Sequence, residues 1–455
     1  MYTKRKIGFL EAYSIGVGGM VGGGIFAVLG LTITLAGGGA PVSFLLAGLI
    51  ALLTTYSYIK LSLRYPSEGG TIEFIVQGFG NTIFAGWANT LLMVSYIIML
   101  ALYAYAFGSY GSALIMGHET IWLEQLLIVA VLVVFVGINL MGALLTGRAE
   151  DIMVFVKLAI LILFSVTCFF TIDPSKLSLD QWKSPVAIFT GGLIIFLAYE
   201  GFELIANTAA DIKEPEKNLP RAYVWSVVSV ILLYVVVSLV AVGNLTPEQV
   251  IKAKDYALAV AAEPFFGKAG FIVIAIAAML STASAINATL YGGGRVTYLI
   301  AKYGELPSGF KRKVKNGYEG MIIIGLAAII FATMFNLENI SVAGSFGFLT
   351  IFGLVNLANF ILYEETQSNR WISLFAFLAC LGSVVVLIGY NFIHNPTSLV
   401  STVVVVVSTF LFSYIYRVYR DHEPLGEYLD KRLAKKEEQQ EQQASDTTAD
   451  RGREN

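Results

Sequence analysis

The sequence predicts an all-α integral membrane protein with twelve transmembrane helices. Of its 455 residues, 56% are hydrophobic and 14% charged, and the mean hydropathy is +0.72. Soluble globular proteins have about 25% charged residues, so this chain carries roughly half the usual charge. Its apolar residues form runs such as 124–146 and 221–243, which suit the ~20 residues that cross a bilayer as a helix. This composition excludes a soluble enzyme, a nucleic-acid-binding protein and a disulfide-stapled secreted domain.

The first predicted span follows a basic N-terminus and is not a signal peptide. Apolar sequence continues to about residue 36 without a small-residue cleavage site. The predicted spans are 8–36, 41–63, 83–115, 122–145, 151–172, 186–210, 221–243, 269–301, 320–336, 340–363, 371–391 and 397–417. They form one domain over 1–417. The polar residues that follow cannot bury apolar area, so we expect 418–455 to be a largely disordered cytoplasmic tail.

The basic residues in the loops predict the orientation. If the N-terminus is cytoplasmic, the cytoplasmic loops hold fifteen Lys and Arg residues and the opposite loops hold five, without counting the tail. Cytoplasmic loops of membrane proteins carry an excess of Lys and Arg. An even number of spans then places both termini in the cytoplasm.

The first span contains a glycine-rich interruption. Gly22, Gly23 and Gly24 are consecutive, and each interior glycine weakens a helix by ~1 kcal/mol relative to alanine. Small residues also allow helices to pack closely. Three glycines in a row exceed what packing requires, so we expect the backbone to unwind here and expose its amide and carbonyl groups.

The sixth span contains a second interruption, at Glu200, Gly201 and Glu203. A charged side chain at this depth costs ~2.5–3.5 kcal/mol, so it usually faces the protein interior or a cavity. Interrupted helices at corresponding positions of two halves indicate an inverted-repeat transporter. The predicted five-plus-five repeat comprises 8–172 and 186–363, with 371–417 as two additional helices.

The two interruptions together suit an α-amino acid. Amide groups at a half-helix start favour a carboxylate, and unwound carbonyls in the sixth span favour an ammonium group. The candidate substrate-binding residues are Gly22, Gly23, Gly24, Ile25, Phe196, Ala198, Tyr199 and Glu200.

Several long motifs resemble the amino acid–polyamine–organocation superfamily, and especially its archaeal proton-coupled amino-acid transporters. These motifs are Gly24-Ile25-Phe26 and the segments 201–207, 214–222, 284–289 and 304–307. The resemblance covers about residues 1–420. It implies a LeuT-like fold, an amino-acid substrate and a multi-pass protein of the cytoplasmic membrane. We expect no enzymatic activity, no cofactor and no nucleic-acid partner, and we expect the monomer in the lipid bilayer to be functional.

The resemblance also implies that a fifth-span lysine takes the place of the sodium ion bound by related transporters. The matching residue is Lys157. We expect its ammonium group to bridge carbonyls near Gly18 and the hydroxyl of Ser281 or Ser284, and to carry the coupled proton; sodium coupling is not expected. The alternative is a lysine whose long stem returns the charge to the membrane interface.

Three interpretations of Glu200 stay open: an additional proton site, an attraction for cationic side chains, or a carboxylate satisfied by neighbouring helices. Glu203 is a candidate gate residue or proton site. Proton-coupled symport of small neutral amino acids is the predicted function. The alternatives are uptake or exchange of cationic amino acids or amines, and an amino-acid sensor on a transporter scaffold. No metal site is expected, because the three histidines lie in loops or near span ends.

Overall fold

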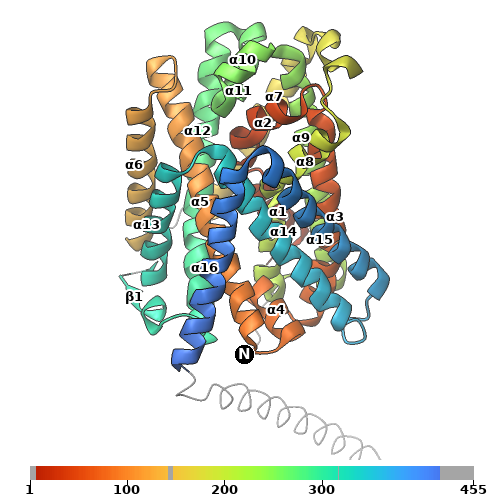
Figure 1. Cartoon of the computed structure of the whole chain (residues 1–455), viewed down its shortest axis with the longest axis vertical. Helices are drawn as coiled ribbons and strands as arrows, with labels where there is room; N and C mark the ends of the chain where they lie inside the picture. The colour runs from red at the N-terminus through yellow and green to blue at the C-terminus, as the bar shows by residue number, and fades with distance from the viewer. Residues whose placement is uncertain (1–6, 142–146, 316, 421–455) are drawn as a thin grey trace, which may run out of the picture.

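The computed structural model describes residues 7–141, 147–315 and 317–420, and most of them lie in long helices that run between two ends of the molecule (Figure 1). Within these ranges, nine helices are long and apolar enough to cross a membrane. They are α3 (Ala40–Arg64), α5 (Ile83–Met116), α6 (Ile121–Leu140), α7 (Gly147–Cys168), α9 (Pro215–Asn244), α12 (Glu263–Lys302), α14 (Leu337–Ile361), α15 (Arg370–His394) and α16 (Pro396–Arg420). The fold is therefore the predicted all-α membrane bundle.

Two further spans are bent pairs, as the two interruptions predict. Helices α1 (Phe9–Met20) and α2 (Gly24–Ala36) meet at 46°, and α8 (Pro185–Ile194) meets the segment Phe196–Asp211 at 53°. Counting each pair as one span gives eleven in the described part of the chain. The remaining predicted span, 320–336, coincides with α13 (Glu319–Met334), which has only 16 residues, so the count of twelve stays a prediction.

The structure contains local elements that the apolar pattern does not indicate. Helix α4 (Thr71–Phe79) has nine residues, too few to cross a bilayer. The second half of the sixth span forms 3-10 helices, η4 (Phe196–Tyr199) and η5 (Phe202–Asp211), in place of a regular α-helix. The remaining short elements are η1 (Phe169–Thr171), η2 (Pro174–Leu177), η3 (Leu179–Gln181), α10 (Pro247–Lys252), η6 (Lys254–Tyr256), α11 (Ala257–Ala261), η7 (Ser308–Lys311) and the antiparallel pair β1 (Lys313–Val314) and β2 (Gly317–Tyr318).

Some segments begin earlier than predicted. Helix α12 begins at Glu263 and is kinked at Gly267, whose φ of +61° is accessible to glycine at little cost. The fifth span starts at Gly147, before the predicted residue 151. The predicted end of the fourth span, residues 142–145, and most of the predicted tail lie outside the described residues.

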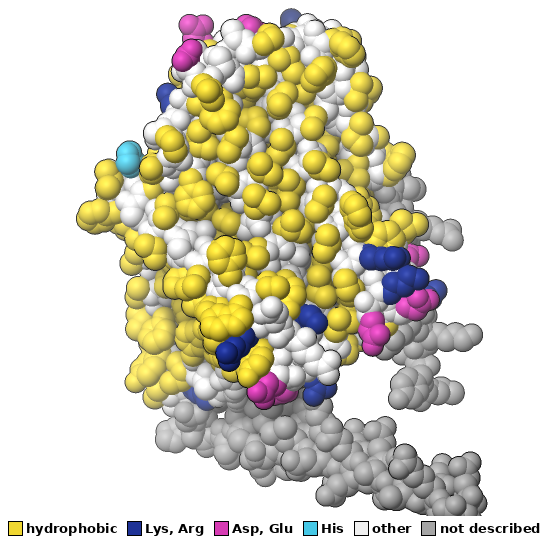
Figure 2. Space-filling view, turned by 90° about the vertical axis from the view of Figure 1, so that its right-hand side faces the viewer, with side chains coloured by type: hydrophobic (Ala, Val, Ile, Leu, Met, Phe, Trp, Pro, Cys, Tyr) yellow, Lys and Arg dark blue, Asp and Glu magenta, His cyan; other side chains and the backbone are white. Residues whose placement is uncertain are grey.

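Burial separates central helices from peripheral ones. The apolar windows of α5 and α14 are 78% and 83% buried, whereas those of α6, α15 and α16 are each 28% buried. Figure 2 shows one side of the molecule, where hydrophobic side chains cover the middle and charged side chains gather toward the two ends. This distribution matches a bundle whose outer helices face lipid.

Candidate functional site

The first interruption is an unwound turn that Tyr103 and α12 close in. Residues 21–23 separate α1 from α2. A Cβ added to Gly23 would lie 2.5 Å from Cδ1 of Tyr103, so only glycine fits at this position. The hydroxyl of Ser281 donates to the carbonyl of Gly22. The first amides of α2 have no earlier carbonyl within that helix to accept their hydrogen bonds.

The second interruption lies directly against the first. Gly201 has φ +119°, and a Cβ added to it would lie 2.4 Å from the carbonyl carbon of Gly19. The hydroxyl of Ser345 accepts a hydrogen bond from the amide of Leu197 at 3.0 Å and donates to the carbonyl of Ile194 at 2.8 Å. These contacts satisfy backbone groups that a continuous helix would pair internally.

One tyrosine joins the two interruptions. The hydroxyl of Tyr234, on α9, lies 2.7 Å from the carbonyl oxygen of Met20 and 3.2 Å from that of Ala198. A hydroxyl has a single hydrogen to donate, so the two carbonyls share it. The ends of α1 and η4 are thereby held against the same side chain.

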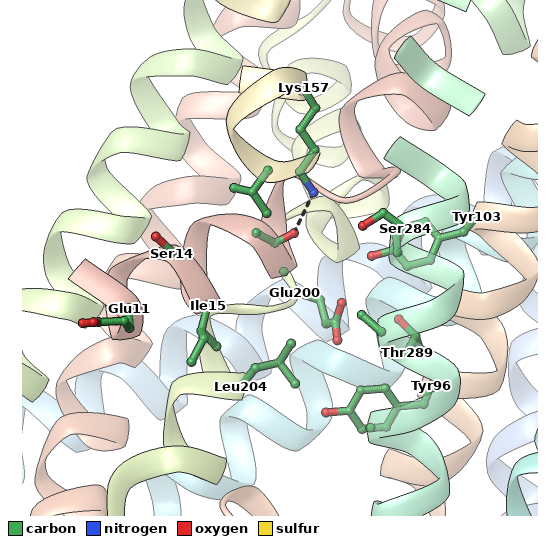
Figure 3. Close-up of a pocket in the computed structure, with 16 residues that line it drawn as sticks. Glu11, Ser14, Ile15, Tyr96, Tyr103, Lys157, Glu200, Leu204, Ser284 and Thr289 are labelled. Atoms are coloured by element: carbon green, nitrogen blue, oxygen red, sulfur yellow. Dashed lines mark hydrogen bonds between the residues drawn. The ribbon is translucent and has the colours of Figure 1, made fainter. Parts of the chain in front are cut away.

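A pocket of about 360 Å³ extends from the interruptions toward the start of α1 (Figure 3). Exposed Glu11 lies at its mouth. It is lined by Glu11, Ser14, Ile15, Gly18, Gly19, Tyr96, Tyr103, Val154, Lys157, Glu200, Leu204, Ser284, Ala285, Ala288, Thr289 and Gly292. These residues come from α1, α5, α7, α12 and the second interruption, so five parts of the chain that are distant in sequence meet here.

Lys157 extends from α7 toward the unwound end of α1, and its side chain is only 4% exposed. Its Nζ donates to the carbonyl oxygen of Gly18 at 3.0 Å, drawn as the dashed line in Figure 3. Ser284 lines the same pocket, while Ser281 is engaged with the carbonyl of Gly22. The predicted contact between Lys157 and the first span is therefore present, and the contribution of these residues to proton coupling stays a prediction.

Glu200 and Glu203 lie side by side at the second interruption and are 4% and 1% exposed. Their carboxyl groups interact with each other, and Tyr103 lies near Glu200 in the same pocket. Glu203 accepts hydrogen bonds from the amide of Gly201 at 2.7 Å and from the hydroxyl of Tyr96 at 3.3 Å. Only Glu200 of the two glutamates lines the pocket.

The other predicted substrate-binding residues surround this pocket without lining it. Phe196, Ala198, Tyr199 and Ile25 are at most 1% exposed, and Gly22, Gly23 and Gly24 are buried as well. The hydroxyl of Tyr199 is occupied by the carbonyl of Phe44 at 2.7 Å. Substrate binding by these residues stays a prediction.

Sequence reasoning missed the two pocket tyrosines of α5. Tyr96 and Tyr103 are seven residues apart, which places them on one face of a helix. That spacing was a usable signal, but in a helix with 25 buried residues it does not distinguish a pocket from ordinary packing.

Among the described residues, no group of three or more His, Cys, Asp and Glu side chains could hold a metal ion. Cys168 and Cys380 are free and buried. The chemistry available in the pocket is that of the carboxyl groups of Glu11 and Glu200, the amine of Lys157, and the hydroxyls of serine, threonine and tyrosine.

Comparisons with known proteins agree with this architecture. The family model described as amino acid permease matches residues 7–416. An uncharacterized protein of Methanocaldococcus jannaschii is 38% identical, covering 91% of this chain and 95% of its own length. The inner membrane transport protein YbaT of Escherichia coli is 30% identical over 85% of this chain and 90% of its own length. The branched-chain amino acid permease BcaP of Bacillus subtilis is 22% identical, with 80% and 82% covered.

Proposed function

Because the chain belongs to the amino acid permease family of the amino acid–polyamine–organocation superfamily, we propose that it transports small neutral amino acids across the cytoplasmic membrane by proton-coupled symport. The observation that carries this proposal is the buried amine of Lys157 on the carbonyl of Gly18, at the meeting point of two interrupted helices. The name of the branched-chain permease supports a neutral substrate.

The two interruptions supply complementary groups for an α-amino acid. The free amides at the start of α2 form the positive end of a helix dipole and favour the substrate carboxylate. Carbonyls of the unwound segments favour the substrate ammonium group. Neither contact needs a charged side chain, so the pocket would select by side-chain size and polarity.

Lys157 couples this site to the proton gradient in the proposed mechanism. Protonated Lys157 holds the carbonyl of Gly18 and so fixes the unwound end of α1 against α7. When the pocket opens toward Glu11 and fills with water, the proton leaves and the contact loses its charge. A proton-motive force of ~150 mV supplies ~3.5 kcal/mol per charge. At ~1.4 kcal/mol per tenfold, that is enough for an accumulation of about three-hundredfold.

Uptake into proteoliposomes tests the proposal. A panel of labelled amino acids would be offered under an imposed pH gradient, an imposed sodium gradient, or neither. We expect uphill uptake of small neutral amino acids that a protonophore abolishes and that sodium does not stimulate. Stimulation by sodium alone would contradict the proposal.

The Lys157→Met variant tests the coupling residue. We expect it to bind the amino acid but to lose accumulation under a pH gradient, because methionine retains the apolar stem and carries no proton. Lys217→Met is the matched control, since Lys217 is exposed and pairs with Glu214 at the surface. Full uphill uptake by Lys157→Met would show that another residue couples transport to protons.

A further inference from the structure

The second interruption contains a pair of buried acidic residues that have no role in the proposed proton coupling through Lys157. Glu200 and Glu203 are three residues apart, are both nearly inaccessible to solvent, and have carboxyl groups close enough to interact. Two carboxylates in contact in a medium of low dielectric cannot both be ionised. The pair is therefore stable only when a proton or another positive charge accompanies it.

The hydrogen-bond partners indicate which carboxyl group carries the proton. One oxygen of Glu203, Oε2, accepts from the amide of Gly201, and the other, Oε1, accepts from the hydroxyl of Tyr96. An ionised carboxylate only accepts hydrogen bonds, whereas a protonated carboxyl group donates one. Both oxygens of Glu203 thus accept hydrogen bonds, which favours an ionised Glu203 and a proton on Glu200.

Glu200 is also the member of the pair with a route to water. It lines the pocket whose mouth carries Glu11 and Ser14, and Glu203 does not. The titratable groups around the pair come from every neighbouring element. They are Tyr96 and Tyr103 on α5, Lys157 on α7, Tyr58 on α3, Tyr223 and Tyr234 on α9, and Glu11 on α1.

We propose that Glu200, sharing one proton with Glu203, is a proton-binding site distinct from Lys157 that loads and unloads through the same pocket. In the unloading step the O–H bond of Glu200 breaks and its proton passes to water in the pocket. Water that enters with opening then solvates the two carboxylates that remain. Assigning this proton to the transport cycle rests on the proposed function. The protonated pair itself does not, because it is expected in the protein without substrate or a gradient.

Infrared spectroscopy of the purified full-length protein tests the pair directly. At neutral pH we expect a carbonyl band of a protonated carboxylic acid that shifts in deuterated water and is lost in Glu200→Gln. Glutamine keeps the shape of the side chain and can still donate to Glu203. The same band should persist in Lys157→Met and in Glu73→Gln, a matched control because Glu73 is a buried glutamate outside this pocket.

A second variant tests the sharing of the proton. In Glu203→Gln the like charge and the carboxylate acceptor are gone, so we expect the frequency of the Glu200 band and the pH at which it is lost to change. Each variant is accepted only if it elutes as a single species and retains the helical circular dichroism of the parent. A band unchanged by Glu200→Gln would overturn the proposal, even if proton-driven uptake is observed.

Uptake by the same variants distinguishes a role of Glu200 in binding a proton from a role in binding a cationic substrate. If Glu200 binds a proton in the parent protein, we expect Glu200→Gln to leave the preference between alanine and lysine unchanged. We expect the same variant to alter the pH dependence of exchange. Loss of lysine uptake alone, with the infrared band unaffected, would instead assign Glu200 to the side chain of a cationic substrate and overturn the proposal. If no variant and no parent shows proton-driven uptake while the band behaves as expected, the proposed function fails and the protonated pair stands.

Discussion

At the residue scale, the pocket depends on glycines, which have no side chain, as much as on the side chains that line it. Gly23 and Gly201 allow a tyrosine ring and a neighbouring backbone to approach within distances that a Cβ would prevent. These contacts bring Tyr103 over the first interruption and Gly19 against the second. The placement of Glu200 and Lys157 in one pocket follows from this close approach.

The substitution Gly23→Ala tests this packing. The new methyl group would lie 2.5 Å from the ring of Tyr103 and 2.8 Å from Cγ2 of Thr282, so both must move. Overpacking of this kind costs about 1–3 kcal/mol, and we expect a lower unfolding temperature together with at least a severalfold loss of uptake. Gly382→Ala is the control, since no atom lies within 4 Å of its added Cβ. Equal effects of the two substitutions would contradict the steric argument.

Residue patterns predicted some of these positions and missed others for a physical reason. The consecutive glycines 22–24 and the acids at 200 and 203 are costly in a membrane helix, and such costs are visible in the sequence. Tyr96 and Tyr103 carry no such energetic cost, because tyrosine packs well in any helix, so the sequence does not mark them. The contact between Glu200 and Glu203 depends on the backbone turn at Gly201, which residue order alone does not determine.

At the element scale, the two broken spans behave as one unit because shared side chains connect them. Tyr234 contacts the last turn of α1 and the end of η4, and Ser345 bridges the gap between α8 and η4. Helices that end inside a membrane leave unpaired backbone groups whose burial is unfavourable. Four of those groups are paired here with α9 and α14, which stabilises the interruptions without continuing either helix.

The substitution Tyr234→Phe tests this connection. It removes one hydroxyl and leaves the buried carbonyls of Met20 and Ala198 without that donor, which costs about 1–3 kcal/mol. We expect a lower unfolding temperature and slower uptake, because α1 and η4 are no longer tied together. Tyr223→Phe is the matched control on the same helix, since its buried hydroxyl pairs with the hydroxyl of Ser62 at 3.2 Å and not with a carbonyl of α1 or η4. A larger loss of uptake in the control than in Tyr234→Phe would contradict this role.

The membrane spans and their interruptions could be predicted from the sequence because the lipid bilayer constrains both. A bilayer demands long apolar runs, and an interruption inside one is conspicuous. Helix α4 and the 3-10 geometry of η5 escaped prediction because short elements carry little periodicity and are shaped by the helices packed around them.

At the scale of the whole molecule, the arrangement of charge gives the bundle a direction. The described N-terminus and the end of α16 lie at the same end, together with α4 and β1, whereas α10 and α11 lie at the opposite end (Figure 1). The basic residues of the loops favour the first of these ends as cytoplasmic. The pocket opens toward that end, so this orientation would make the structure an inward-facing one.

Labelling of single introduced cysteines tests the orientation. Asp180→Cys, in η3, and Lys313→Cys, in β1, replace exposed residues that the topology assigns to opposite sides of the membrane. We expect a membrane-impermeant maleimide to label Asp180→Cys on intact cells and Lys313→Cys only after permeabilisation. The parent protein serves as the control, because Cys168 and Cys380 are buried and should not react. The reverse pattern would place the pocket mouth outside the cell. Lys157 would then face the proton-rich side in this conformation. The proposed coupling requires the proton to be released toward the cytoplasm, so this result would contradict it.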